Sequence, residues 1–332
     1  MKTTLSCSVP KPAAFGSARW IRYRQHGARG GFLISGNRRI SLFDAVALGL
    51  CATWRQHRFA SRKEMGRLRF PCLWILMFAA LPGCGTLPSG SGWGENATIA
   101  PGWDRVRQAA VGAARDPLVW GPLLGAAMLQ VDDWDKRISD WASDHTPVFG
   151  SQQSAKDWSS DLRTASKVAY HVTTLATPSG ETPGDWLINK AKGYAVGAVA
   201  IGTTTSVTGY LKSEVGRERP NNKDNESFPS GDTSKSSIYT RLASRNLRSI
   251  DMSANARDWS NIGLGALTVG TAWSRVEAKA HYPSDTLFSI TLGNFFGAFF
   301  NDAFLGLDNE TTAVWFERDR DAVTLRFSMR FP

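Results

Sequence analysis

Three short stretches between residues 212 and 285 carry side chains of the kinds that bind and attack a phosphate. The first reads Lys212-Ser-Glu-Val-Gly-Arg-Glu-Arg219-Pro220, the second Phe228-Pro-Ser-Gly-Asp232, and the third Ser274-Arg-Val-Glu-Ala-Lys-Ala-His281-Tyr-Pro-Ser-Asp285. Lysine and arginine supply positive charge, and a guanidinium binds two phosphate oxygens at once. An imidazole close to a carboxylate is a candidate nucleophile. The residue types therefore predict an anion site that can also do covalent chemistry.

The cations and the nucleophile come from the first and third stretches. Lys212 and Arg219 are seven residues apart, which is two helical turns, so they share one face if the helix runs that far. Arg275 adds a forked donor for phosphate oxygens. His281 is the candidate nucleophile. Asp285, four residues on, can hold one ring nitrogen and raise the nucleophilicity of the other.

The second stretch supplies a helix start. Ser230 and Gly231 precede a helical segment, where a hydroxyl and free backbone N–H groups meet the helix dipole, which favours an anion. Each signal is weak alone, because a lone lysine or arginine is usually on a solvated face and Pro-Ser-Gly is usually a turn. Their order along the chain is what makes the set specific.

Together, the three stretches resemble the signature motifs of the type 2 phosphatidic acid phosphatase (PAP2) superfamily, which also contains bacterial class A acid phosphatases and vanadium haloperoxidases. The pattern is Lys, six residues, Arg-Pro; Pro-Ser-Gly-His; and Ser-Arg, five residues, His, three residues, Asp. This chain matches every position but one. The resemblance covers roughly residues 116–305 and implies an all-α fold, a helical bundle of the acid phosphatase type.

The resemblance also implies a phospho-histidine mechanism that needs no metal and no cofactor. His281 attacks phosphorus and Asp285 orients it. The phosphoryl group is bound by Lys212, Arg219, Ser230, Gly231 and Arg275. Phosphoryl transfer depends mainly on positioning and charge stabilisation, which such a set supplies. His145 and His171 have no partners at metal-ligand spacing.

The departure from the pattern is Asp232, where the superfamily has a histidine that protonates the leaving group. An aspartic acid is normally ionised near neutral pH, and a position at a helix start stabilises the ionised form further. Asp232 is either a helix-capping residue in a degenerate site, or a general acid whose pKa is raised by burial or by the bound phosphate. Because the nucleophile and the cations are intact, we expect an active but weakened phosphoric monoester hydrolase.

Two other functions stay open. A phosphate- or lipid-headgroup-binding lipoprotein with little turnover would keep the cations and lose the acid. A haloperoxidase would bind vanadate through His281, but is also expected to need the missing histidine. Activated esters such as p-nitrophenyl phosphate separate the first alternative from an enzyme, because their leaving group barely needs protonation.

Residues 65–84 have the anatomy of a secretory signal peptide. Arg67 and Arg69 precede an apolar stretch at residues 70–81 that is too short to span a bilayer. The ending Leu81-Pro-Gly-Cys84 resembles the lipobox of bacterial lipoproteins, in which the cysteine is lipidated. The resemblance implies a signal peptide at 65–83 and a non-native upstream extension at 1–64. The alternative is a buried apolar helix at 70–82.

The same resemblance predicts where the protein acts. No acidic residue follows Cys84 at the sorting position, which favours the outer membrane, with the domain in the periplasm. The expected partners are therefore the membrane, through the lipid on Cys84, and a phosphorylated lipid or a small phosphoester as substrate. No cysteine follows Cys84, so the globular part has no disulfide and no thiolate zinc site.

The charge distribution argues against nucleic acid as a partner. The chain has a formal net charge of +10, but residues 1–64 hold 12 basic and two acidic side chains and account for all of it. A nucleic-acid-binding domain needs its basic excess on the folded part. The rest of the chain is electrically balanced.

The elements that must position the site are mostly helices. Residues 84–115 begin with a Gly-, Ser- and Pro-rich run and are expected to be the lipidated cysteine and a flexible tether. Apolar helices are predicted at 118–131, 186–212, 261–273 and 286–304, within a phosphatase domain at 116–305. Small or polar residues break each of them, and mean hydropathy is −0.24, which argues against membrane spans. In the tail, 306–332, alternating residues at 313–317 and 322–331 predict a small β-hairpin.

Overall fold

The computed structural model describes residues 85–306, 313–319 and 322–328. Helices make up most of these residues, as the sequence predicts, and a two-stranded hairpin follows them. The helices are α3 (Trp103–Arg115), α4 (Pro117–Met128), the 3₁₀ turn η1 (Val131–Asp133), α5 (Trp134–His145), α6 (Gln152–Ala176), α7 (Pro183–Val215), α8 (Gly231–Leu247), α9 (Ala254–Glu277), α10 (Pro283–Phe300) and the π-helical turn η2 (Asn301–Leu305). The strands β1 (Ala313–Asp319) and β2 (Ala322–Ser328) pair antiparallel, with Ala313 opposite Ser328.

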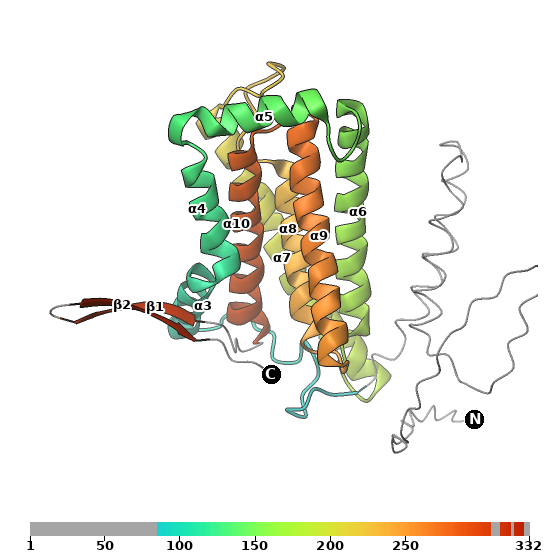
Figure 1. Ribbon diagram of the computed structural model, residues 1–332. Coiled ribbons are helices and arrows are strands. Elements are labelled where there is room, and N and C mark those ends of the chain that lie inside the picture. The colour runs from blue at the N-terminus through green and yellow to red at the C-terminus, as the bar shows by residue number, and fades with distance from the viewer. Residues whose placement is uncertain (1–84, 307–312, 320–321, 329–332) are drawn as a thin grey trace, which may run out of the picture. The chain divides into compact units, whose positions relative to one another are not determined.

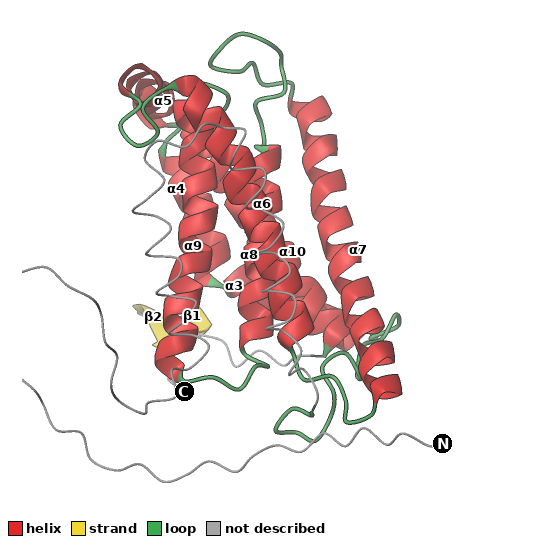
Figure 2. Cartoon of the chain, turned by 90° about the vertical axis from the view of Figure 1, so that its right-hand side faces the viewer, coloured by secondary structure: helices red, strands yellow, loops and turns green. Residues whose placement is uncertain are grey.

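The helices form a bundle in which the axes of α4 and α6 to α10 lie side by side along the length of the bundle, and α5 lies across one end (Figure 1). Helix α8 is at the centre and packs against α6, α7, α9 and α10. Helix α7 borders the bundle on one side (Figure 2). The predicted helical bundle with a C-terminal hairpin is confirmed. None of the described helices is long and apolar enough to cross a membrane.

Small and hydroxyl-bearing residues allow the central helices to pack closely. A Cβ atom on Gly293 of α10 would lie 2.5 Å from the Cβ of Ser237 of α8, so only glycine permits this approach. Hydroxyl groups between helices satisfy one another, as Thr240 and Thr268 do at 2.6 Å. Buried polar groups are tolerated when each has a hydrogen-bond partner. The serine and threonine content of α8 is therefore part of its packing.

Residues 85–115 correct the prediction of a flexible tether. Residues 103–115 form α3, and the preceding segment is held against the bundle. Gly85 pairs with Gly180 through two backbone hydrogen bonds of 3.0 and 2.9 Å. The side chain of Trp93 is 2% exposed, and its ring lies so close to Gly193 of α7 that a Cβ there would be 2.1 Å away. Burial of a tryptophan fixes the segment in a way that composition does not reveal.

Three chain reversals gather at the end of the bundle where α5 lies. Helix α7 ends before Gly216, which has φ of +57° and donates its N–H to the carbonyl of Lys212. Helix α9 ends before Lys279, with φ of +52°, and α10 begins at Pro283, where proline suits the first turn. Helix α8 begins after its N-cap residue, Ser230. These reversals bring the three predicted motifs together.

The predicted signal peptide, the lipobox cysteine Cys84 and residues 1–64 lie outside the described residues.

Candidate active site

His281 lies in the loop between α9 and α10 and is almost fully buried, with 2% of its surface exposed. Its Nδ1 is 2.5 Å from the carbonyl oxygen of Ser227. A carbonyl only accepts, so Nδ1 carries the proton and Nε2 has the free lone pair. Nε2 is 3.2 Å from a guanidinium nitrogen of Arg219. The nitrogen available for attack therefore faces a phosphate-binding cation.

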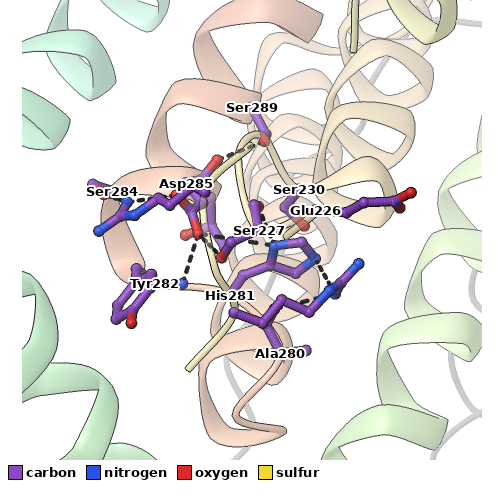
Figure 3. Close-up of polar contacts among 12 residues, drawn as sticks. Glu226, Ser227, Ser230, Ala280, His281, Tyr282, Ser284, Asp285 and Ser289 are labelled. Atoms are coloured by element: carbon purple, nitrogen blue, oxygen red, sulfur yellow. Dashed lines mark hydrogen bonds and ion pairs between the residues drawn. The ribbon is translucent and has the colours of Figure 1, made fainter. Parts of the chain in front are cut away.

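Asp285 does not hold the histidine in the way the sequence predicts. Its nearest carboxylate oxygen is 3.9 Å from Nδ1 of His281, too far for a hydrogen bond. The same oxygen accepts the hydroxyl of Ser227 at 2.5 Å. Figure 3 shows Ser227 between the two side chains. Asp285 therefore orients His281 through Ser227, whose hydroxyl it binds and whose carbonyl binds the ring.

Arg217 and Asp135 fix Asp285 in turn, and the sequence reasoning missed both. Arg217 donates to Asp285 at 2.6 Å and to Asp135 at 2.7 Å. Asp135, at the start of α5, also accepts the backbone N–H of Ser284 in the first turn of α10 at 2.8 Å. Burial raises the pKa of the Asp285 carboxyl, and the Arg217 charge offsets part of that rise. The only sequence signal was the position of Arg217 inside the first motif.

Lys212 and Arg219 do not share a helix face, because α7 ends at Val215 and Arg219 lies in the following loop. Asp224 positions Arg219 by accepting its Nε–H at 2.5 Å. Lys212 stays on the last turn of α7, where its amine donates to the carbonyl of Glu226 and its Cε lies over the start of α8. The two cations therefore meet through the loop and not through helical periodicity.

The third cation, Arg275, is on the last turn of α9 and faces Asp232. Its guanidinium is 3.4 Å from one carboxylate oxygen of Asp232, and Arg163 of α6 is 3.2 Å from the other. Nothing in the sequence had pointed to Arg163. Asp232 lies in the first turn of α8 without capping it, and two arginines bind its carboxylate form. This geometry favours neither the predicted role of Asp232 as a helix cap nor its predicted role as a general acid.

The start of α8 presents the donors that the sequence predicted. Ser230 is fully buried, and its hydroxyl is 3.0 Å from that of Thr233. The N–H groups of the first turn, from Gly231 onwards, have no intrahelical acceptor because no turn precedes them. Lys212 lies beside Gly231. An anion placed here would meet the positive end of the helix dipole and an ammonium group.

Electrostatics keep the histidine neutral. Burial, followed by the charges of Arg275, Arg219 and Lys212, holds the pKa of His281 well below its usual value. Burial also lowers the pKa of Lys212, and Arg219 adds to that effect. Arg219 contacts Nε2 of His281, and Lys212 and Arg275 both lie at the start of α8, so the predicted phosphate-binding residues gather around the predicted nucleophile. At neutral pH the lone pair on Nε2 is free of a proton.

Comparison with known proteins gives one family match and one similar solved structure. A sequence model of the PAP2 superfamily matches residues 221–305. A solved structure titled as the first transmembrane PAP2 type phosphatidylglycerolphosphate phosphatase, from Bacillus subtilis, is similar at 18% identity and a TM-score of 0.41. That similarity covers 54% of this chain and 90% of the other. No curated protein matches the chain.

The superfamily match spans the second and third motifs, from Phe228 to Asp285, and begins just after the first motif ends at Pro220. The resemblance is therefore confirmed over the second and third motifs, within residues 221–305, which match the PAP2 superfamily model.

Proposed function

We propose that the protein is a metal-independent phosphatase that works through a phospho-histidine intermediate on His281. The observation that carries this proposal is the state of the ring. His281 is buried and neutral, its Nδ1 proton is bound by a carbonyl, and its Nε2 lone pair faces Arg219. A histidine held in this way is prepared as a nucleophile and not as a proton donor.

The residues around the ring suit each step of the transfer. The phosphoryl oxygens take the donors of Arg219, Arg275 and Lys212, which frees Nε2 from its contact with Arg219. Nε2 then forms a bond to phosphorus, and the bond to the ester oxygen breaks, so that the leaving group departs with the electron pair and takes a proton from solvent water. A second water attacks the phosphorus of the phospho-imidazole and loses a proton to the solvent, which returns the electron pair to Nε2 and releases inorganic phosphate. Cations aimed at the transferred group stabilise both transition states.

A second candidate is a phosphate- or lipid-headgroup-binding protein with weak turnover. The observation that favours it is the pair of arginines on Asp232, Arg163 and Arg275. A guanidinium group faces each carboxylate oxygen of Asp232, so neither oxygen is directed at a leaving group. In that case the protein would bind phosphate esters well and cleave only those with good leaving groups.

We further propose that the substrate is a phosphomonoester or a lipid (pyro)phosphate and that the enzyme acts at the periplasmic face of the outer membrane. The support for the location is the lipobox-like sequence that ends at Cys84, and the support for the substrate class is the match to the PAP2 superfamily. The lipobox-like sequence is independent of the site geometry, so the proposed location and the proposed catalysis can be tested separately.

The deciding experiment measures phosphate release by the purified protein from p-nitrophenyl phosphate, an alkyl phosphate and phosphatidic acid. We expect the wild type to cleave at least the activated ester, and His281→Ala to abolish release with an unchanged circular dichroism spectrum. The cations cannot replace the nucleophile. A phospho-enzyme trapped on any other residue would contradict the assignment of His281, and a wild type that binds phosphate but cleaves no ester would favour the second candidate.

A further inference from the structure

One face of α6 lies against the phosphate-binding arginine of the third motif. Ser159 and Arg163 are four residues apart and therefore on the same side of this helix. The hydroxyl of Ser159 is 3.4 Å from Arg275, and Arg163 is 3.2 Å from Asp232. Both side chains thus contact the Asp232–Arg275 pair, although α6 carries none of the three motifs.

The charges of this group explain what Arg163 contributes. With Arg275 alone, the Asp232 carboxylate would form a one-to-one ion pair, and its negative charge would cancel the attraction of Arg275 for a phosphate. Two guanidinium groups share the carboxylate, one on each oxygen, so one positive charge remains. The negative charge of Asp232 would repel an incoming phosphate and weaken its binding, and the positive charge of Arg163 offsets that repulsion.

Arg275 also has one N–H group that makes no hydrogen bond within the described residues. Its side chain is only 12% exposed, and its Nε–H has no hydrogen-bond partner among the described residues. Burial lowers the pKa of Arg275, an effect that Asp232 opposes. A buried donor without an acceptor is costly unless a ligand binds it. Arg275 can therefore take a phosphoryl oxygen, provided that Asp232 does not hold all of its charge.

We propose that Arg163 is a positioning residue of the phosphate site: it neutralises Asp232 and so keeps Arg275 available for the phosphoryl group. This inference rests on the proposed phosphate-ester chemistry. It assigns to α6 a role that compensates for the aspartate standing where the motif has a histidine.

The test is a double-mutant cycle between Arg163 and Asp232. The dissociation constant for inorganic phosphate is measured by titration calorimetry, and KM and kcat with p-nitrophenyl phosphate. Arg163→Ala is expected to raise the dissociation constant and KM by about tenfold, with a smaller change in kcat. The same substitution in an Asp232→Asn background is expected to change them by less than about twofold, because no carboxylate is left to neutralise. Arg163→Lys should retain part of the effect.

Lys167→Ala is the matched control, because it removes the same charge from an exposed position one turn further along α6. Lys167→Ala is expected to change neither the dissociation constant for phosphate nor KM. Equal losses from Arg163→Ala in both backgrounds, or no loss in either, would overturn the proposal. If the wild type binds phosphate but cleaves no ester, the enzymatic proposal fails and the cycle is judged on the dissociation constants. If the wild type does not bind phosphate, both proposals fail.

Discussion

At the scale of single residues, the two ring nitrogens of His281 are held in their protonation states by different groups. On one side, a backbone carbonyl fixes the Nδ1 proton, and a chain of partners behind it, Ser227, Asp285, Arg217 and Asp135, fixes that carbonyl. On the other side, burial and then the neighbouring cations lower the pKa of His281, which leaves Nε2 unprotonated. The residue that does not belong to either group is Asp232, whose negative charge faces the place where a phosphate would bind.

Asp232→Asn tests whether this carboxylate is a general acid. Because two arginines bind it as a carboxylate, we expect the asparagine variant to hydrolyse alkyl phosphates as fast as the wild type or faster. Asp232→His should raise alkyl-ester turnover further, since a histidine can donate a proton near neutral pH. The measurement is kcat for an alkyl phosphate and for p-nitrophenyl phosphate across pH 4–8.

A general acid would give a different pattern. Alkyl-phosphate turnover would fall by about 10²–10⁴-fold in Asp232→Asn, with a much smaller loss for p-nitrophenyl phosphate. That result would refute the ion-paired role and restore Asp232 as the proton donor.

The neutral histidine also predicts how stability depends on pH. The pKa of His281 is lower in the folded chain than in the unfolded chain, so the unfolded state binds the proton first as pH falls. The stability that the neutral ring contributes is complete above about pH 6.5 and is lost below it, with a slope of up to about 1.4 kcal/mol per pH unit. Urea unfolding at pH 7.5 and 5.5 should therefore show a steeper loss for the wild type than for His281→Gln. Equal losses would mean that His281 does not stay neutral in the folded protein.

At the scale of elements, the sequence predicted the helices better than it predicted their ends. Four apolar segments, the hairpin and the start of α8 at Gly231 were foreseen from composition and turn residues. The end of α7 at Gly216 was not, and this one residue moves Arg219 from the helix into a loop. Contacts between distant segments, such as Asp135 with Arg217, cannot be read from local spacing. For the same reason Arg163 carried no signal, since it lies 69 residues before its partner Asp232.

Trp93→Ala tests the packed N-terminal segment. The indole is 2% exposed, lies against Gly193, and has the amine of Lys190 at 5.1 Å from its ring centroid. Loss of such a side chain should lower the free energy of unfolding by about 3–5 kcal/mol. The control is Trp103→Ala, because Trp103 is 77% exposed and should cost less than about 0.5 kcal/mol. If both variants unfold at the same urea concentration, residues 85–102 are the flexible tether that the composition first suggested.

At the scale of the whole molecule, the site and the start of the described chain lie at opposite ends of the bundle. Gly85 pairs with Gly180, close to the start of α7, whereas Lys212 is on its last turn. Helix α7 has 33 residues and therefore spans about 50 Å. Residues 85–102 are packed against the bundle, so Gly85 and the site are held near opposite ends of this helix.

Cys84→Ser tests the proposed attachment to the membrane, because in our proposal the lipid on Cys84 is the membrane anchor. The variant should lack the acyl chains in a mass spectrum and should leave the membrane fraction in a carbonate wash, while the wild type remains there. A single acyl chain binds only marginally, so stable attachment depends on the full lipid modification. Its kcat/KM with p-nitrophenyl phosphate should stay within about twofold of the wild type, since the lipid contributes nothing to the site.

The bundle also exposes large apolar side chains, among them Trp259, Met128 and Ile262. If Cys84→Ser stays with the membrane after the wash, the lipid on Cys84 is not the anchor, and exposed apolar side chains of the bundle attach the protein instead.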